Sequence, residues 1–353
     1  MFYLCHPIFI PNMLESKIIY ILAIESSCDD TSAAVLQNNV VLSNVVANQK
    51  IHEEYGGVVP ELASRAHQQN IVPVVNQALA KANIDKKQLS AIAFTRGPGL
   101  MGSLLVGTSF AKSLALGLNI PLIEVNHMQA HILAHFIKEE SMLPPRFPFL
   151  ALTISGGHTQ IVKVDDYFEM EILGQTLDDA VGEAFDKSAK ILGLPYPGGP
   201  LVDKYATKGN PLRFEFPKPK VNGVNFSFSG LKTSILYFIQ KKTKEDSDFI
   251  KENLEDICAS IQYTIVTILM AKLKKAVKLT GINHVAIGGG VSANSAIRKA
   301  MKDAEVNMGW VTYIPKFEYC TDNAGMIGIV GYLKFLNEDF SEQHITAKAR
   351  YVI

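Results

Sequence analysis

Apolar and polar positions alternate along this chain in an order that occurs twice. Each copy opens with an apolar run, continues with a small polar turn and closes with a second apolar run. Short apolar runs bounded by turn-forming residues predict β-strands, so each copy predicts a strand, a tight turn and a returning strand. The three segments are residues 18–24, 25–31 and 33–36 in the first copy, and residues 149–154, 155–159 and 161–164 in the second.

The parallel between the copies continues after each hairpin. A short buried strand leads through a glycine loop into a helix, and a further strand then leads into a second helix that has residues able to bind a metal near its start. Four matched steps in the same order favour a duplication. Two α/β domains would then face each other across a cleft, with both turns and both glycine loops aimed into it. The segments are residues 91–94, 96–99, a helix through Leu116 and 121–125, then residues 284–287, 288–294, a helix through Met301 and 311–314.

The length of 353 residues fits two domains, and the repeat suggests where they lie. We expect the first domain at residues 18–135 and the second at residues 149–336, with an insertion at about residues 174–251. Residues 1–17 are expected to be an N-terminal extension, and residues 337–353 a C-terminal tail.

Composition restricts the classes of function. Hydrophobic residues make up 48% of the chain and charged residues 19%, which supports a sizeable core and excludes wholesale disorder. Basic and acidic residues number 34 each, so the net charge is zero, and this argues against a protein that coats nucleic acid by bulk electrostatics. A nucleic-acid substrate would need a local basic patch or a partner. Residues 201–280, with 14 basic and 8 acidic residues, are the candidate patch.

The sequence also bears on location. No apolar run reaches the roughly 18 residues that a membrane-spanning helix needs. The longest, residues 104–123, is interrupted by Lys112, Asn119 and Pro121, so we expect a buried helix followed by a strand and no membrane association. The four cysteines are far apart and none belongs to a CxxC pair, which fits a reducing compartment. The first 17 residues lack the basic region of a signal peptide, so a cytoplasmic location is expected.

A candidate metal site is shared between the two copies. His127 and His131 are spaced i, i+4, which places them on one face of a helix. This spacing alone is more often structural, but Asp322 lies at the matching place in the second copy. Two histidines and one carboxylate leave coordination positions open, and both iron and zinc fit such a set. A zinc peptidase of the HExxH class needs a glutamate directly after the first histidine, and Met128 stands there instead.

Two glycine-rich turns are candidate sites for a phosphate. The turn at residues 155–159 permits close approach of backbone amides to an anion, and residues 288–290 lie between a strand and a helix N-terminus. Each turn alone is more often structural. Neither fits the dinucleotide fingerprint or the P-loop, so both of those classes are excluded. Two such loops facing one cleft favour a nucleotide.

An acidic segment of the insertion is a further candidate. Its charged residues are predicted to lie on a helix, where Asp179, Glu183 and Asp186 share one side. A carboxylate on the cleft side could hold a ribose, a hydroxyl or an amine, and the alternative is a solvated helix face. The segment comprises Asp178, Asp179, Glu183, Asp186 and Lys187.

Taken together, nine motifs between residues 18 and 336 resemble the TsaD family, the bacterial tRNA threonylcarbamoyladenosine transferases once described as O-sialoglycoprotein endopeptidases. This chain departs slightly from the usual pattern at Ser26 and Asp30, and it has Gln129 where glutamate is frequent. The motifs are IESSCDDT at 24–31, YGGVVPELASR at 55–65, GPGL at 97–100, NHMQAH at 126–131, SGGHT at 155–159, GEAFDK at 182–187, YPGGP at 196–200, FSFSGLK at 226–232 and GGGVSAN at 288–294.

The resemblance implies a fold and an activity. The fold would be of the actin/Hsp70/sugar-kinase type, with two duplicated ribonuclease-H-like domains around a nucleotide cleft. The enzyme would transfer a threonylcarbamoyl group from threonylcarbamoyl-AMP to N6 of the adenosine next to the anticodon, in tRNAs that read codons beginning with adenine. The implied partners are a TsaB-like paralogue that lacks the metal site and a small TsaE-like ATPase.

The resemblance also implies the site residues. One divalent metal ion, iron ahead of zinc, would be held by His127, His131 and Asp322. The implied substrate-binding residues are Thr153, Ile154, Ser155, Gly156, Gly157, Asp186, Gly199, Asp203 and Asn294.

The chemistry of the transfer suggests one catalytic residue. The donor is a mixed anhydride with a good leaving group, whereas the exocyclic amine is a poor nucleophile, so the enzyme must align the two and exclude water. Asp29, in the first hairpin turn, is our candidate for steering or deprotonating the amine. Two alternatives remain: a metal-dependent glycoprotein endopeptidase, and a catalytically idle partner or chaperone-like ATPase module.

Overall fold

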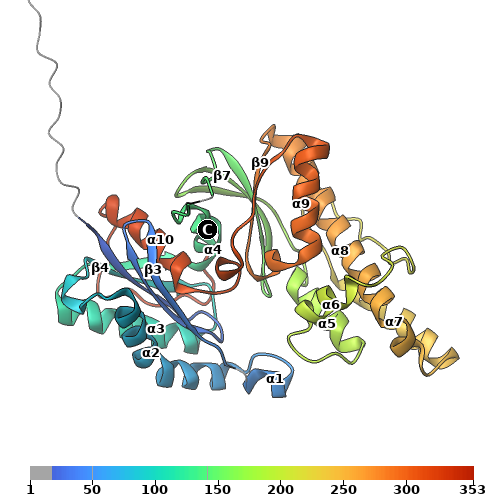
Figure 1. The fold of residues 1–353 in the computed structure, drawn as a ribbon, viewed down its shortest axis with the longest axis horizontal. Helices are drawn as coiled ribbons and strands as arrows, with labels where there is room; N and C mark the ends of the chain where they lie inside the picture. The colour runs from blue at the N-terminus through green and yellow to red at the C-terminus, as the bar shows by residue number, and fades with distance from the viewer. Residues whose placement is uncertain (1–17, 50, 141) are drawn as a thin grey trace, which may run out of the picture.

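Two five-stranded mixed sheets form the frame of the protein (Figure 1). The computed structural model describes residues 18–353 apart from residues 50 and 141, so the expected extension at residues 1–17 lies outside the described residues. The first sheet has the order β3-β2-β1-β4-β5, and the second has the order β8-β7-β6-β9-β10. The strands are β1 Tyr20–Glu25, β2 Thr31–Gln37, β3 Val40–Ala47, β4 Ala91–Gly97, β5 Leu122–Asn126, β6 Phe149–Ile154, β7 Thr159–Asp166, β8 Glu169–Gln175, β9 His284–Gly288 and β10 Val311–Tyr313.

The two sheets repeat one topology, which confirms the duplicated α/β plan. In each sheet the first three strands form an antiparallel meander, and the first strand then pairs in parallel with the fourth. The fifth strand pairs in parallel with the fourth. The third strand of each meander, β3 and β8, was not predicted, because both are edge strands whose exposed positions break the apolar run.

Helices cover both faces of the first sheet. Alternate side chains of a strand point to opposite faces, and in β1 Leu22 and Ile24 pack with α2 and α3, whereas Ile21 and Ala23 pack with α10. A proline at the first position starts α2, and both α2 and α3 end at an asparagine in the left-handed region. The helices of this half are α1 Ile51–Tyr55, α2 Pro60–Ala82, α3 Met101–Leu118 and α4 His127–Leu133, with short 3-10 turns at Lys86–Gln88 and Ala134–Phe136.

The chain crosses between the halves twice. Helix α4, which ends the first copy, contacts β6 and β9 of the second sheet, and Figure 1 shows it between the sheets. Helix α10, Ala324–Leu336, follows the second copy in sequence but packs against the first sheet. Its glycines permit this close approach, because a Cβ at Gly328 would lie 2.1 Å from Leu36 Cδ1 and one at Gly331 would lie 2.5 Å from Ala93 Cβ.

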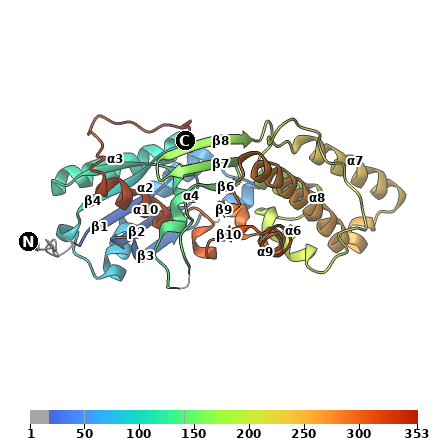
Figure 2. The same ribbon diagram turned by 90° about the horizontal axis from the view of Figure 1, so that it is seen from above.

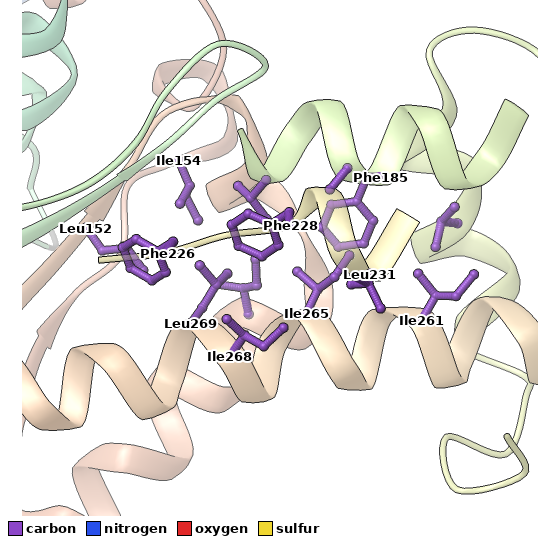
Figure 3. Close-up of a cluster of buried hydrophobic side chains, with 14 of the residues drawn as sticks. Leu152, Ile154, Phe185, Phe226, Phe228, Leu231, Ile261, Ile265, Ile268 and Leu269 are labelled. Carbon is purple, nitrogen blue, oxygen red and sulfur yellow. The ribbon is translucent and has the colours of Figure 1, made fainter. Parts of the chain in front are cut away.

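The insertion and the long helix that follows it build a helical core beside the second sheet. Figure 2 shows its helices extending away from the first sheet. Phe226 and Phe228 lie stacked with ring centroids 6.3 Å apart, and they fill the space between α5 and α8 (Figure 3). The helices of this half are α5 Val181–Ile191, α6 Gly198–Ala206, α7 Ser229–Glu245, α8 Phe249–Thr280 and α9 Ser295–Met308, with 3-10 turns at Gly290–Ala293 and Phe317–Tyr319.

Helices α3 and α8 are long and apolar enough to cross a membrane by length and composition alone. Helix α8 buries Ile257, Ile261 and Ile265 in the core of the insertion, and α3 packs against α2 and the first sheet. Packing within the protein therefore explains the apolar residues of α8, whereas α3, predicted to be buried, is only partly so and leaves Met101, Leu105 and Leu116 exposed. The predicted helix followed by a strand at residues 104–123 is confirmed as α3 and β5.

Candidate active site

Three side chains from the two crossover segments converge on one point. His127 and His131 lie one turn apart on α4, and Asp322 lies two residues before α10. The Oδ1 atom of Asp322 is 3.4 Å from His127 Nε2 and 3.3 Å from His131 Nε2. One ligand atom from each of the three residues lies within 4.8 Å of the other two. The structure thus brings together the three predicted metal ligands across a separation of almost two hundred residues.

The environment of His131 fits a metal ligand. The ring is 1% exposed, and among the described residues neither of its nitrogens has a hydrogen-bond partner of good geometry. A buried polar group without such a partner carries a free-energy penalty that a coordinated cation would remove. The two imidazoles are almost perpendicular, at 87°, so their nitrogens approach Asp322 from different directions. Two imidazoles and one carboxylate suit zinc or iron.

A fourth residue, Glu25, orients His127. It ends β1 and is fully buried, and its Oε2 lies 3.0 Å from His127 Nδ1 and accepts a hydrogen bond of 2.6 Å from the Thr95 hydroxyl. Its other oxygen accepts the backbone N–H of Ser27. A carboxylate on Nδ1 fixes a proton there, so Nε2 is the nitrogen that faces Asp322. We did not single out Glu25 from the sequence, although a carboxylate at the end of a fully apolar strand is a usable signal.

Electrostatic interactions in the cluster shift the titration of each member. Burial opposes a positive charge on His127, but Asp322 and Glu25 outweigh it and hold its pKa well above the usual value. Burial lowers the pKa of His131, so that ring is neutral. Burial also disfavours charge on Asp322, yet the positive charge of His127 and the close approach of both imidazoles lower its pKa. In the absence of a metal, a proton on His127 is therefore held between two carboxylates, where a divalent cation would replace it.

A cavity of about 1100 Å³ opens beside this cluster and is walled by both halves. The two hairpin turns face each other across it, as the duplicated plan predicted. Of the predicted site residues, seven line this cavity. They are Asp29, His127, Ser155, Gly156, Gly157, Asp186 and Asp322.

The turn at residues 155–157 is the candidate anion site. A Cβ at Gly156 or Gly157 would meet no atom within 4 Å, so this backbone faces open space. The turn is backed by the first residues of α5, where the N–H of Gly182 donates to Ser155 O at 3.2 Å. A Cβ at Gly182 would lie 2.7 Å from that oxygen, so only glycine permits this approach. The positive end of α5 thus lies behind the turn, which favours a negatively charged ligand.

Asp186 links the cavity wall to α6. Its Oδ1 accepts the backbone N–H groups of Gly198 and Gly199, both at 2.9 Å, and burial raises its pKa. The amide of Gly199 is consequently occupied by Asp186. Asp186 itself lines the cavity, and a ligand there would meet a carboxylate that is already fixed in place.

The remaining predicted ligand positions do not belong to the cavity wall that the structure describes. Thr153 and Ile154 are buried in β6. Asp203 accepts hydrogen bonds from the backbone N–H and the hydroxyl of Ser295, at 3.0 and 2.6 Å. Asn294 caps α9 and donates to Gln262 Oε1 at 2.7 Å. In this structure the polar groups of Asp203 and Asn294 hold the N-terminus of α9.

Two acidic residues of the insertion lie elsewhere than predicted. Asp178 and Asp179 precede α5, which begins at Val181, so they are not part of the helix. Asp178 accepts hydrogen bonds from Ser227 and Ser229 at the start of α7, which explains why a turn replaces helix here.

The first hairpin turn is held by a buried histidine. His67 lies 3.0 Å from Cys28 O through Nε2 and 2.7 Å from Thr31 Oγ1 through Nδ1. Burial, followed by the charge of Asp29, raises the pKa of Asp30 to about 7. Burial and the neighbouring carboxylates also raise the pKa of Cys28, so its thiol is poorly reactive. Asp29 and Asp30 thus line the cavity as a pair of carboxyl groups.

Comparison with known proteins assigns the family. Residues 40–329 match the family model TsaD, tRNA N6-adenosine threonylcarbamoyltransferase. Relatives with that name include one from Christiangramia forsetii, 74% identical over 96% of this chain and 99% of its own length. Others come from Riemerella anatipestifer, 62% identical over 94% and 97%, and Cytophaga hutchinsonii, 59% identical over 95% and 97%.

Solved structures agree on the fold alone. Full-length HypF in the phosphate- and nucleotide-bound form is 14% identical, with a TM-score of 0.58 over 92% of this chain and 47% of that one. The HypF of T. kodakarensis is 17% identical, with a TM-score of 0.57 over 91% and 48%. The two duplicated mixed sheets have the predicted actin/Hsp70/sugar-kinase architecture. By sequence and fold, this chain belongs to the TsaD family of tRNA N6-adenosine threonylcarbamoyltransferases.

Proposed function

We propose that this chain transfers a threonylcarbamoyl group from threonylcarbamoyl-AMP to N6 of the adenosine next to the anticodon, in tRNAs that read codons beginning with adenine. The family and its relatives' names support the transferase activity. One observation carries the mechanism: the His127–His131–Asp322 cluster, the turn at residues 155–157 and Asp29 all meet at one cavity.

The cluster fits one divalent cation, iron ahead of zinc, held by His127, His131 and Asp322. Bound there, the cation would anchor the donor and act as a Lewis acid. Glu25 keeps Nε2 of His127 free for this role.

The remaining steps belong to the chain's own residues. Backbone amides at Gly156 and Gly157 would hold the phosphate end of the donor, whereas the predicted amide of Ser155 already donates to His158 O at 2.9 Å. The N6 nitrogen forms a bond to the carbamoyl carbon, the bond from that carbon to the phosphate oxygen breaks, and AMP leaves with the electron pair. Asp29 would orient the amine and accept the proton that N6 loses. The other predicted ligand residues, Thr153, Ile154, Asp186, Gly199, Asp203 and Asn294, would shape and support the nucleotide pocket.

A glycoprotein endopeptidase is the disfavoured alternative. The peptidase mechanism of the HExxH class requires a general base beside the first histidine. Met128 occupies that position and is 2% exposed, packed in the apolar interior. The relatives' names likewise support the transferase and not the peptidase.

We further propose that the enzyme works in the cytoplasm with partner proteins, a TsaB-like paralogue and a TsaE-like ATPase. A chain of zero net charge should bind tRNA weakly on its own, and with a strong salt dependence. Multiple-turnover transfer by the isolated chain, supplied only with donor and tRNA, would disprove the need for partners.

The test of the function is mass spectrometry of tRNA nucleosides after depletion of this protein, with rescue by variants. Wild-type protein should restore threonylcarbamoyladenosine, whereas His127→Ala and His131→Ala should not. Both variants should fold, because His127 lines the cavity and His131, although buried, has no well-formed hydrogen bond to lose among the described residues. His284→Ala is the matched control, since that histidine lies 2.8 Å from the Tyr313 hydroxyl on β10 and belongs neither to the cluster nor to the cavity wall. Glycoprotein cleavage by the metal-loaded wild type, lost in His127→Ala, would favour the peptidase instead.

A further inference from the structure

The last residues of the chain run along the first sheet and end beside the metal helix. We define the C-terminal strap as residues 341–353. It follows the edge strand β5, crosses the end of β4 and contacts the loop at residues 98–100, which lines the cavity. The backbone hydrogen bonds along it are Ser341 N to Leu122 O at 2.7 Å, Lys348 N to Arg96 O at 2.8 Å and Gly99 N to Ala349 O at 3.2 Å.

Side chains also anchor the strap. The ring of Tyr351 lies under two cations, with Arg96 5.3 Å and Lys348 4.9 Å from its centroid, and its hydroxyl is 3.4 Å from Glu124 Oε1. Arg96 in turn forms an ion pair with Glu124 on β5. At Gly97 the strap passes so close that a Cβ would lie 1.8 Å from Lys348 O, so glycine is required there. The strap is therefore fitted to the sheet along its length.

The strap ends on the residue that caps α4. The side-chain NH₂ of Asn126 donates to Tyr351 O at 3.3 Å and to Val352 O at 3.2 Å. Its Oδ1 accepts the backbone N–H groups of Met128 at 2.9 Å and Gln129 at 3.3 Å. An amide has two donor hydrogens and two acceptor lone pairs, so this side chain is fully used. The oxygen of the Asn126 amide caps the first turn of α4, and the nitrogen is bound by the strap.

We propose that the C-terminal strap positions the metal helix. By fixing the Asn126 amide, the carbonyls of Tyr351 and Val352 set where α4 begins and how the next residue, His127, faces Asp322. Helix α4 has only seven residues, so the cap is a large share of what fixes its orientation. This inference rests on the proposed metal site.

Partners in the outer shell of a metal site change metal affinity by about 10–100-fold when they are removed. The strap acts one step further out, through Asn126, so deleting residues 351–353 should weaken Zn²⁺ binding by about tenfold, the lower end of that range, while the protein still folds. Asn126→Ser should do the same, because serine can still cap the helix but has no second donor for the strap. Combining the two changes should weaken binding no further than the deletion alone, since the link that Asn126→Ser breaks is already absent in the deletion variant.

The experiment is a Zn²⁺ titration against a chromogenic chelator, with the Co²⁺ absorption spectrum as a readout of coordination and thermal unfolding in EDTA as a test of folding. Val352→Ala is the matched control, because that side chain is 76% exposed and the contact uses its carbonyl. If the deletion variant bound Zn²⁺ with wild-type affinity, or if the losses in the two single variants added fully in the combined variant, the role of the strap would be wrong and the metal site would stand. If the wild type bound neither cation, the metal site and this inference would both be wrong. Should the deletion variant unfold, Asn126→Ser carries the test.

Discussion

Replacing Glu25 by glutamine tests how the histidine ligand is prepared for a metal. One oxygen of Glu25 accepts the N–H of Ser27, which can only donate, so the single oxygen of glutamine must stay there. The new NH₂ group then faces His127 Nδ1 and the hydroxyl of Thr95. Thr95 can turn to Ile24 O, 3.5 Å away. The NH₂ group that now faces His127 favours an acceptor at Nδ1 and a proton that stays on Nε2; the one competing partner is the Ser27 hydroxyl, a weaker acceptor than a carboxylate, 3.2 Å from Nδ1.

A protonated Nε2 cannot coordinate a cation. In the variant, metal binding therefore requires that the proton leave Nε2 and that Nδ1 take a proton while it faces an NH₂ group. We expect Zn²⁺ affinity to fall by about 10–100-fold, the usual effect of losing an outer-shell carboxylate, which corresponds to about 1.4–2.8 kcal/mol. The fold should survive, because glutamine has the same shape and its oxygen keeps the bond to Ser27.

Isothermal titration with Zn²⁺ measures this effect directly. Glu139→Gln is the matched control: Glu139 is a partly buried carboxylate that pairs with Lys316 and accepts the hydroxyl of Tyr319, without touching a metal-ligand candidate. It should bind Zn²⁺ as the wild type does. A Glu25→Gln protein whose affinity stays within about threefold of the wild type would refute the tautomer argument.

Three further predictions concern pH and the anion turn. Asp322 and Glu25 hold the pKa of His127 above its usual value against the cost of burial, so Zn²⁺ must displace a proton when it binds. Titrations should therefore show Zn²⁺ affinity rising about tenfold per pH unit below that pKa, and an affinity that does not change with pH would contradict this. Burial and Asp29 raise the pKa of Asp30 to about 7, so the folded state binds a proton that the unfolded state has lost. The free energy of unfolding of the wild type should therefore decrease as the pH rises from about 4 to about 7. Melting curves of Asp30→Asn should show a smaller decrease, and an equal decrease would exclude Asp30 as its source. Gly182→Ala would place a Cβ 2.7 Å from the carbonyl that starts the anion turn, so kinetics should show a raised KM for the donor with unchanged Zn²⁺ affinity, whereas loss of both would indicate a wider distortion.

The duplicated α/β plan and the meeting of His127, His131 and Asp322 could be predicted from the sequence. Both depend on local signals: apolar runs bounded by turns, and an i, i+4 pair on a helix. The matching of the two copies then placed Asp322 opposite the histidines, which no single motif does. Edge strands β3 and β8 escaped prediction, because edge positions face solvent and carry a mixed pattern.

Other features depend on contacts between distant segments, which no local pattern records. Glu25 matters because Thr95 and His127 reach it from other strands and helices. Asp203 belongs to a candidate binding set by resemblance, yet in this structure its oxygens are taken by Ser295, a residue 92 positions away. Asp178 lies outside the predicted helix because its carboxylate accepts hydrogen bonds from Ser227 and neighbouring groups, which a position on a helix surface would not provide.

The late position of α10 in the sequence also shapes how the chain is made. The face of the first sheet that includes Ile21, Leu36 and Ala93 is covered by a helix that begins at Ala324. A ribosome working at about 5–20 residues per second finishes α10 some 10–40 s after it has completed the first copy. During that interval the nascent sheet presents bare apolar surface, so the amino-terminal half cannot mature ahead of the rest. A fragment ending after α4 should accordingly aggregate or stay bound to chaperones, and adding α10 in trans should reduce its exposed apolar surface.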